Sequence, residues 1–94
     1  MRFAWDENKN KTNRARHGVS FEAAQCVFDD RHAISVQDRH ECGGERWQTL
    51  GLVGGVVVLL VAHTYREQGN VGVIHMISAR KATKRERQRY EQAR

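Results

Sequence analysis

Apolar and polar residues alternate at the start of the chain, a pattern that is typical of a short strand. Asp6 then suits a helix N-cap, because its carboxylate can accept hydrogen bonds from the first unpaired amides of a helix. We expect a helix from residue 7 to about 17, ended by Gly18 in the left-handed conformation. Ser20 is expected to cap a second, shorter helix that ends near residue 30. The first third of the chain is therefore predicted to be helical.

The pattern changes from Ala33 onwards, where short apolar runs are separated by glycine-rich or polar segments. Such runs predict an antiparallel meander, with strands over residues 33–36, 45–53, 56–65 and 71–78. Between the second and third strands, Gly54-Gly55 is expected to form a two-residue hairpin turn. Residues 40–44 and 66–70 are expected to be polar loops.

The last segment carries a capping box, since Thr83 and Glu86 have the spacing at which each side chain satisfies one amide of a helix start. A helix from Lys84 to about Ala93 follows, and Tyr90 is its main apolar anchor. A chain of 94 residues is long enough for one domain. We therefore expect a single α+β domain over residues 1–94, with an antiparallel sheet of about four strands, two N-terminal helices and one C-terminal helix.

The charge is concentrated at the C-terminal end. Residues 1–79 contain nine Lys or Arg and nine Asp or Glu, whereas residues 80–94 contain seven basic and two acidic residues. A localised basic patch favours a partner that carries phosphates or an acidic protein surface. A solvated, charge-rich helix would give the same composition, so the patch alone does not choose between a nucleic acid, a protein and no partner.

Cysteine usage and the polar N-terminal segment indicate a cytoplasmic protein. Two cysteines make no disulfide framework, and the first eleven residues lack the apolar stretch of a secretion signal. The longest apolar run, residues 50–62, contains three glycines and is much shorter than the about 20 residues of a membrane helix, so no membrane is expected. Four residues mix metal-ligand types without the spacing of a zinc motif, so neither a metal nor a cofactor is expected: Cys26, His32, His40 and Cys42.

The expected hairpin turn sets the register of the sheet and so the faces of its polar residues. A two-residue turn at Gly54-Gly55 places Arg46 beside His63 and Glu45 beside Thr64, and the next turn is expected to place Arg66 opposite Val71. Polar residues then gather at the end of the sheet that contains Glu45, His63 and Arg66. Cleavage of RNA through its 2′-hydroxyl needs a base, an acid and cations around the phosphorane, and these residue types can supply all three.

The chain resembles the BrnT family of toxins. Trp5-Asp6-x-x-Lys9-x-x-x-Asn13-x-x-x-His17-Gly18 resembles the opening block of that family. Glu45-Arg46, Thr64-x-Arg66 and the segment from Ile77 to Tyr90 resemble its later blocks, in the same order over nearly the whole chain.

This resemblance implies a RelE-like fold and a ribonuclease toxin of a type II toxin–antitoxin system. It further implies metal-independent endonucleolytic cleavage of RNA, which inhibits translation and growth. It implies neutralisation by a BrnA-type ribbon-helix-helix antitoxin in a 2:2 complex, with operator DNA bound only through the antitoxin.

The resemblance also suggests roles for individual residues. Arg66 and Arg80 would clamp the scissile phosphate, His63 or Glu45 would act as base or acid, and Tyr90 is a further catalytic candidate. The residues expected to grip other RNA phosphates are Lys9, Arg46, Lys81, Lys84 and Arg85. The chain departs from the family where His75 stands at a position that often carries Arg, which exchanges a permanent cation for a titratable group.

Two other classes of function stay open. A basic module could bind nucleic acid or its antitoxin without cutting RNA, and a degenerate toxin could be retained to modulate the antitoxin. The presence of Glu45, Arg66 and Arg80 favours the enzyme.

Overall fold

The computed structural model describes residues 1–41 and 44–93 and has an α+β fold. In chain order its elements are β1 (Arg2–Ala4), α1 (Glu7–His17), α2 (Phe21–Ala24), the 3-10 helix η1 (Gln25–Asp29), β2 (Ile34–Glu41), β3 (Gly44–Val53), β4 (Val57–Gln68), β5 (Val71–Lys81) and α3 (Lys84–Ala93). The α+β class, the two N-terminal helices and the C-terminal helix are confirmed. None of these helices has the length and apolar character that crossing a membrane would require.

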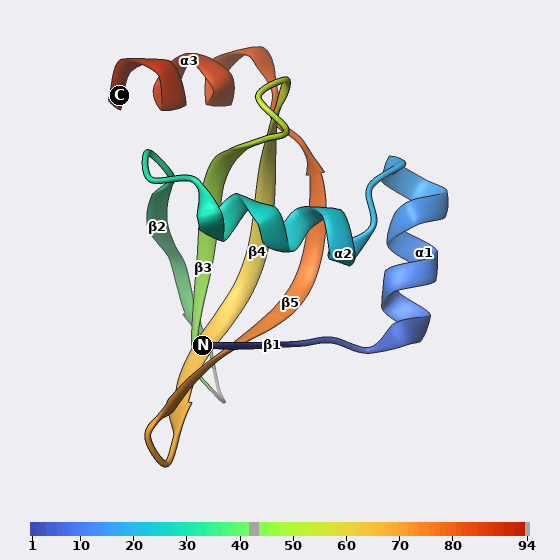
Figure 1. Ribbon diagram of the computed structural model, residues 1–94, viewed down its shortest axis with the longest axis vertical. Coiled ribbons are helices and arrows are strands. Elements are labelled where there is room, and N and C mark those ends of the chain that lie inside the picture. The colour runs from blue at the N-terminus through green and yellow to red at the C-terminus, as the bar shows by residue number, and fades with distance from the viewer. Residues whose placement is uncertain (42–43, 94) are drawn as a thin grey trace.

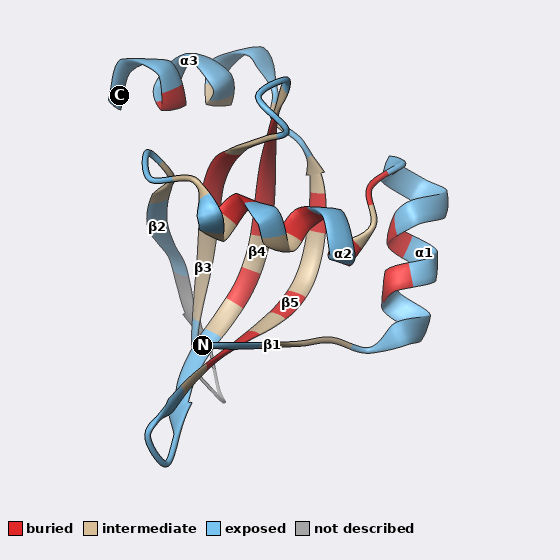
Figure 2. Ribbon diagram, in the orientation of Figure 1, coloured by how far each residue is buried: buried red, intermediate tan, exposed pale blue. Residues whose placement is uncertain are grey.

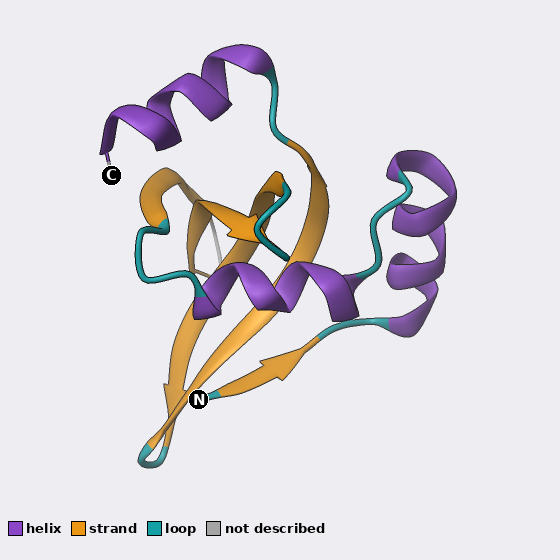
Figure 3. Ribbon diagram, turned by 45° about the horizontal axis from the view of Figure 1, so that its top comes forward, coloured by secondary structure: helices purple, strands orange, loops and turns teal. Residues whose placement is uncertain are grey.

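The strands form one mixed sheet in the order β1-β5-β4-β3-β2. The expected four-stranded antiparallel meander is present as β2 to β5, and β1 adds a fifth strand that runs parallel to β5. Helix α2 and η1 cross one face of the sheet, α1 lies beyond the β5 edge, and α3 lies at one end of the strands (Figure 1). When the top of the molecule is turned forward, sheet strands lie between α3 and α2 (Figure 3).

Local capping chemistry sets the helix ends as the sequence predicts. The Asp6 carboxylate accepts a hydrogen bond from the Asn8 amide, and Gly18 ends α1 with a φ of 72°. At the C-terminal helix, the Glu86 carboxylate accepts from the Thr83 amide and the Thr83 hydroxyl accepts from the Glu86 amide, at 2.9 and 3.2 Å. This reciprocal pair is the predicted capping box.

The turn between β3 and β4 differs from the prediction and changes the register of the sheet. The loop contains three residues, Gly54, Gly55 and Val56. Both glycines adopt positive φ, and the Val56 side chain is 86% exposed and has no partner in the ladder. Val53 therefore pairs with Val57, and His63 pairs with Trp47 and not with Arg46. The side-chain period of a strand is two residues, so this shift moves every β4 side chain to the face opposite the predicted one.

The turn between β4 and β5 is also tighter than expected. The strands continue to a two-residue turn at Gly69-Asn70, so that Arg66 pairs with Val73 and not with Val71. The register shifts once more between Ala62 and His63, where β5 carries a bulge that leaves Ile77 without a partner in β4. The predicted loop over residues 66–70 was therefore too long. The predicted loop over residues 40–44 proves to be mostly strand, and its residues 42 and 43 lie outside the described residues.

The two faces of the sheet bury separate apolar clusters. Figure 2 marks the buried positions along the strands and helices. Side chains of β4 and β5, including Val61 and Met76, pack against Phe21 and Val27 of α2 and η1. On the opposite face Leu50, Val58 and Leu60 pack against Tyr90 of α3. Close packing of η1 on β3 depends on Gly51, where a Cβ atom would lie 2.6 Å from a methyl carbon of Val27 and 2.9 Å from its carbonyl oxygen.

Candidate functional site

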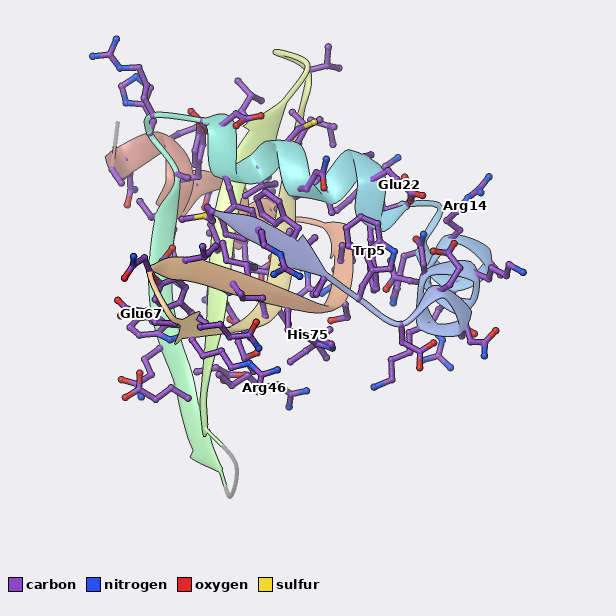
Figure 4. The ribbon with its side chains drawn as sticks, turned by 60° about the horizontal axis from the view of Figure 1, so that its bottom comes forward. Trp5, Arg14, Glu22, Arg46, Glu67 and His75 are labelled. Carbon is purple, nitrogen blue, oxygen red and sulfur yellow. The ribbon has the colours of Figure 1, made fainter. Side chains whose placement is uncertain are left out.

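A row of polar side chains crosses the sheet on the face that packs against α3. Arg46 of β3 pairs with Thr64 of β4, and Thr64 pairs with His75 of β5. Residues paired in this way point to the same face of a sheet, so the three side chains are neighbours. All three are half-buried. Figure 4 shows Arg46 and His75 on the side of the strands away from α2.

A second row adds two more cations to this face. Arg66 of β4 pairs with Val73 of β5, and Val73 pairs with Arg2 of β1. Both arginines are exposed. Arg80 belongs to the same face, where it pairs with Leu60. We call the surface formed by these residues the cationic face: Arg2, Arg46, Arg66, His75 and Arg80. Arg80 borders the apolar cluster that α3 covers, and the other four residues lie further along the strands.

Arg80 is held by α3. Its guanidinium donates two hydrogen bonds to the two carboxylate oxygens of Glu86, at 2.8 and 3.0 Å. This bidentate pair lowers the pKa of Glu86 to about 2 and raises the pKa of Arg80. The pair therefore ties the start of α3 to β5, and it fixes the orientation of a guanidinium that is 38% exposed.

His63 and Glu45 lie on the opposite face from the arginines. The Ser35 hydroxyl lies 2.7 Å from the Thr49 hydroxyl, which lies 2.8 Å from Nε2 of His63. This chain of polar groups crosses β2, β3 and β4 at a pocket of about 310 Å³, which Glu45 also lines. His63 is 5% exposed and meets the ring of Phe28 edge-on at 5.0 Å. The sheet thus separates His63 and Glu45 from Arg66 and Arg80.

Burial of His63 predicts a loss of stability in acid. Burial lowers the pKa of this imidazole, which a hydrogen bond with the Thr64 carbonyl partly opposes. The unfolded chain then binds a proton that the folded chain resists, so the free energy of unfolding falls as pH drops below about 6.5. We expect urea unfolding midpoints that decrease from pH 7.5 to pH 5.5, and a smaller decrease in His63→Gln. An equal decrease in both proteins would contradict this assignment.

Tyr90 is an internal residue of the α3 contact. It is 1% exposed, and its hydroxyl donates a hydrogen bond to the Asp30 carboxylate, which also accepts from the Leu52 amide at 2.8 Å. Burial raises the pKa of Asp30, but hydrogen bonds from Leu52, Tyr90 and His32 outweigh this effect and hold it below its ordinary value. The Tyr90 ring therefore packs on the sheet while its hydroxyl meets a charged carboxylate.

The predicted RNA-binding residues are distributed over three regions. Lys9 lines a groove between α1 and β5, whereas Lys81 lines a pocket on the α2 side of the sheet together with Arg14. Lys84 and Arg85 are exposed in the first turn of α3. Arg46 is the member of this predicted set that belongs to the cationic face.

Sequence reasoning did not single out Arg2 or Thr64 as site residues, and it treated His75 as a departure from the family. Arg2 reaches the cationic face through the parallel pairing of β1 with β5, for which the sequence offers no local signal. Thr64 and His75 join Arg46 because of the true register. Among the side chains that the structure describes, those of residues 1–38 and 45–93, no three His, Cys, Asp or Glu are grouped so that they could hold a metal ion. The side chain of His40 is not among them. Cys42, one of the residues weighed for zinc, lies outside the described residues.

Comparison with known proteins gives one family. Residues 5–86 match the family model of the ribonuclease toxin BrnT of type II toxin–antitoxin systems. The fold is similar to the 1.1 Å crystal structure of the Brucella abortus ribonuclease toxin BrnT, with a TM-score of 0.68 and 24% sequence identity over 89% of this chain and 99% of that one. Comparison with curated protein sequences finds no match. Since the family model covers most of its length, this chain belongs to the BrnT family of ribonuclease toxins of type II toxin–antitoxin systems.

Proposed function

We propose that this protein is a metal-independent endoribonuclease and that its reaction takes place on the cationic face. The observation that carries this proposal is the row of Arg46, Thr64 and His75, with Arg66 one row further along the sheet. A half-buried arginine and an exposed one next to a histidine combine phosphate recognition with a side chain that can act as a general base.

The chemistry needs one bond to form and one to break. The 2′-oxygen of the substrate attacks the adjacent phosphorus, and the bond from phosphorus to the 5′-oxygen breaks. His75 would take the proton of the 2′-hydroxyl as a base, and water or a second protonated group would protonate the leaving 5′-oxygen. Guanidinium groups of Arg46 and Arg66 would hold the equatorial oxygens of the phosphorane, where negative charge increases. The products are a 2′,3′-cyclic phosphate and a 5′-hydroxyl end.

This proposal keeps some of the residues that the sequence suggested and reassigns others. Arg66 stays as a ligand of the scissile phosphate. Arg80, which Glu86 orients, is level with Leu60, about 20 Å along the strand from Arg66, so we assign it to a flanking phosphate. His63 and Glu45 are on the other face, so we assign the role of base to His75 in their place. Tyr90 is assigned to the packing of α3 because its hydroxyl is occupied by Asp30.

Family membership supports the proposal that the partner is an antitoxin. We propose a BrnA-type ribbon-helix-helix antitoxin, a 2:2 complex and contact with operator DNA through the antitoxin, in the cytoplasm. The exposed basic turn of α3 at Lys84 and Arg85 offers a complementary surface to an acidic antitoxin segment as well as to RNA.

The proposed activity is tested with antitoxin-free protein, naked RNA and an excess of EDTA. We expect new 5′-hydroxyl ends in the presence of EDTA, and far fewer with His75→Ala or Arg66→Ala protein at the same concentration and time. Restoration of cleavage by added Mg²⁺ alone would contradict metal independence. Binding without cleavage, both on naked RNA and with translating ribosomes, would favour a non-catalytic basic module.

A further inference from the structure

We propose that a groove between α1 and β5 binds phosphates of the RNA that flank the scissile bond. The groove measures about 260 Å³ and its walls are side chains of α1 and the β5 bulge: Asn8, Lys9, Thr12, Arg16, His17 and Ser78. We call it the α1 groove. The inference rests on the proposed function and extends it, because it assigns Arg16 and His17 to the path of the RNA.

A buried amide fixes the orientation of α1 around this groove. The Asn13 side chain donates to the carbonyl oxygens of Ala79 at 2.7 Å and Val19 at 2.9 Å, and it accepts from the Ala79 amide at 3.2 Å. Asn13 is 6% exposed. It bonds the backbone of β5 at Ala79, past the residues 73–75 that pair with β1. Lys9 lies one helical turn before Asn13 and His17 lies one turn after it, so both are on the same side of α1 as Asn13.

The α1 groove is continuous with the cationic face. Ser78, which lines the groove, pairs with Ala62 of β4 and therefore points to the same face as Arg46, Thr64 and His75. The bulge at Ile77 separates Ser78 from His75 along β5. A strand of RNA that crosses His75 can therefore continue over the bulge towards α1 without passing around the edge of the molecule.

The opposite side of α1 provides a natural comparison. Arg14 lines a different pocket, together with Leu59 and Lys81, on the face of the sheet that α2 covers. A hydrogen bond from Asn10 is the main reason why the pKa of the Glu22 carboxyl is lowered, and the charge of Arg14 lowers it further. Figure 4 shows Arg14 and Glu22 close together. Arg14 and Arg16 are both exposed arginines of one helix, but they belong to opposite faces of the sheet.

The chemistry of the groove suits a phosphate backbone. Lys9 and Arg16 bring two cationic side chains together beside the imidazole of His17, and no carboxylate lines the groove within the described part of the chain. Lys9 and Arg16 are seven residues apart, which is about 10 Å along a helix, so together they can contact more than one phosphate of an extended strand. An acidic protein segment would also be attracted, but the continuity with the proposed catalytic row favours the RNA substrate.

The test compares Arg16→Ala and Lys9→Ala/Arg16→Ala with the matched control Arg14→Ala. Binding to a fluorescent single-stranded 12-mer that carries a 2′-O-methyl group at every ribose is measured by anisotropy over a range of salt. We expect dissociation constants that increase about 3- to 10-fold for Arg16→Ala, with a salt slope that falls by about 0.7 for each lost phosphate contact. Arg14→Ala is expected to change binding less than twofold. With a cleavable 12-mer, the loss is expected in KM, and it should shrink with a dinucleotide substrate.

The outcomes separate this inference from the proposed function. Equal weakening by Arg14→Ala and Arg16→Ala would overturn the α1 groove, even if the wild-type protein cuts RNA. A wild-type protein that binds the 12-mer but cuts no RNA would overturn the nuclease, while the difference between the two arginine variants would still support the groove. If polyglutamate displaces the fluorescent 12-mer as well as unlabelled 12-mer does at equal charge, and if Arg16→Ala weakens the binding of both, the occupant is an acidic protein segment and the inference is wrong. Unchanged thermal unfolding of the variants shows that they are folded.

Discussion

Replacing Arg66 by alanine is expected to lower the rate of RNA cleavage by about 100-fold or more, because removal of one charged donor from a transition state has effects of this size. Arg66 is exposed and belongs to the cationic face, one row from Thr64 and His75. The loss should appear in kcat, since the phosphorane carries more negative charge than the bound phosphodiester. Stability should be unchanged, because substitutions at exposed positions have small effects on the free energy of unfolding.

Two further variants make this expectation specific. Arg66→Lys keeps the charge but loses the two parallel donors of a guanidinium, so we expect it to recover a fraction of the lost rate. Glu67→Ala changes the next residue of β4, which is also exposed and points to the other face, and it should cleave at the wild-type rate. Growth arrest on expression gives the same ranking in cells. If Arg66→Ala protein cleaves as fast as the wild type, the reaction does not take place on the cationic face.

The helices could be predicted because their signals are local. Asp6, Gly18 and the pair of Thr83 and Glu86 each bond a backbone group within a few residues, so both partners of every capping bond lie in one short segment. The meander could be predicted for a related reason, since apolar runs alternate with turn residues. The residue types of the site could likewise be proposed, because arginine is the side chain whose paired donors best match a phosphate.

The arrangement of the site could not be predicted, because it depends on single residues in two loops. Val56 joins the turn and not the strand, and this one position puts Arg46 and His63 on opposite faces, where a two-residue turn would have placed them side by side. The two-residue turn at Gly69-Asn70 then places His75, and not Val73, in the row with Thr64. Two predictions that identify the same strands can therefore place the site on opposite faces of the sheet. Arg2 is a different case, since its place next to Val73 depends on a parallel pairing between the two ends of the chain.

The second large effect concerns α3, whose contact with the sheet depends on Tyr90. Tyr90→Ala is expected to reduce the free energy of unfolding by about 3–5 kcal/mol, the usual range for truncating a fully buried aromatic residue. Domains of this size are stable by about 5–14 kcal/mol, so the variant would be marginally folded. The ring packs against Leu50, Val58 and Leu60, and the helix has few other apolar residues to replace it. Urea unfolding followed by tryptophan fluorescence measures the change.

Tyr90→Phe separates packing from chemistry at the same position. The ring stays, while the hydrogen bond to Asp30 is lost, and Asp30 keeps those from the amides of Leu52 and His32. We expect a loss of about 1–3 kcal/mol, since the remaining partner is a carboxylate. Cleavage should keep the wild-type kcat at a temperature where both proteins are folded. A variant with unchanged stability and a much lower kcat would show that Tyr90 is a catalytic residue and that the reaction takes place closer to α3. The combination of lost stability with retained kcat would instead show that Tyr90 acts only in the packing of α3 on the sheet.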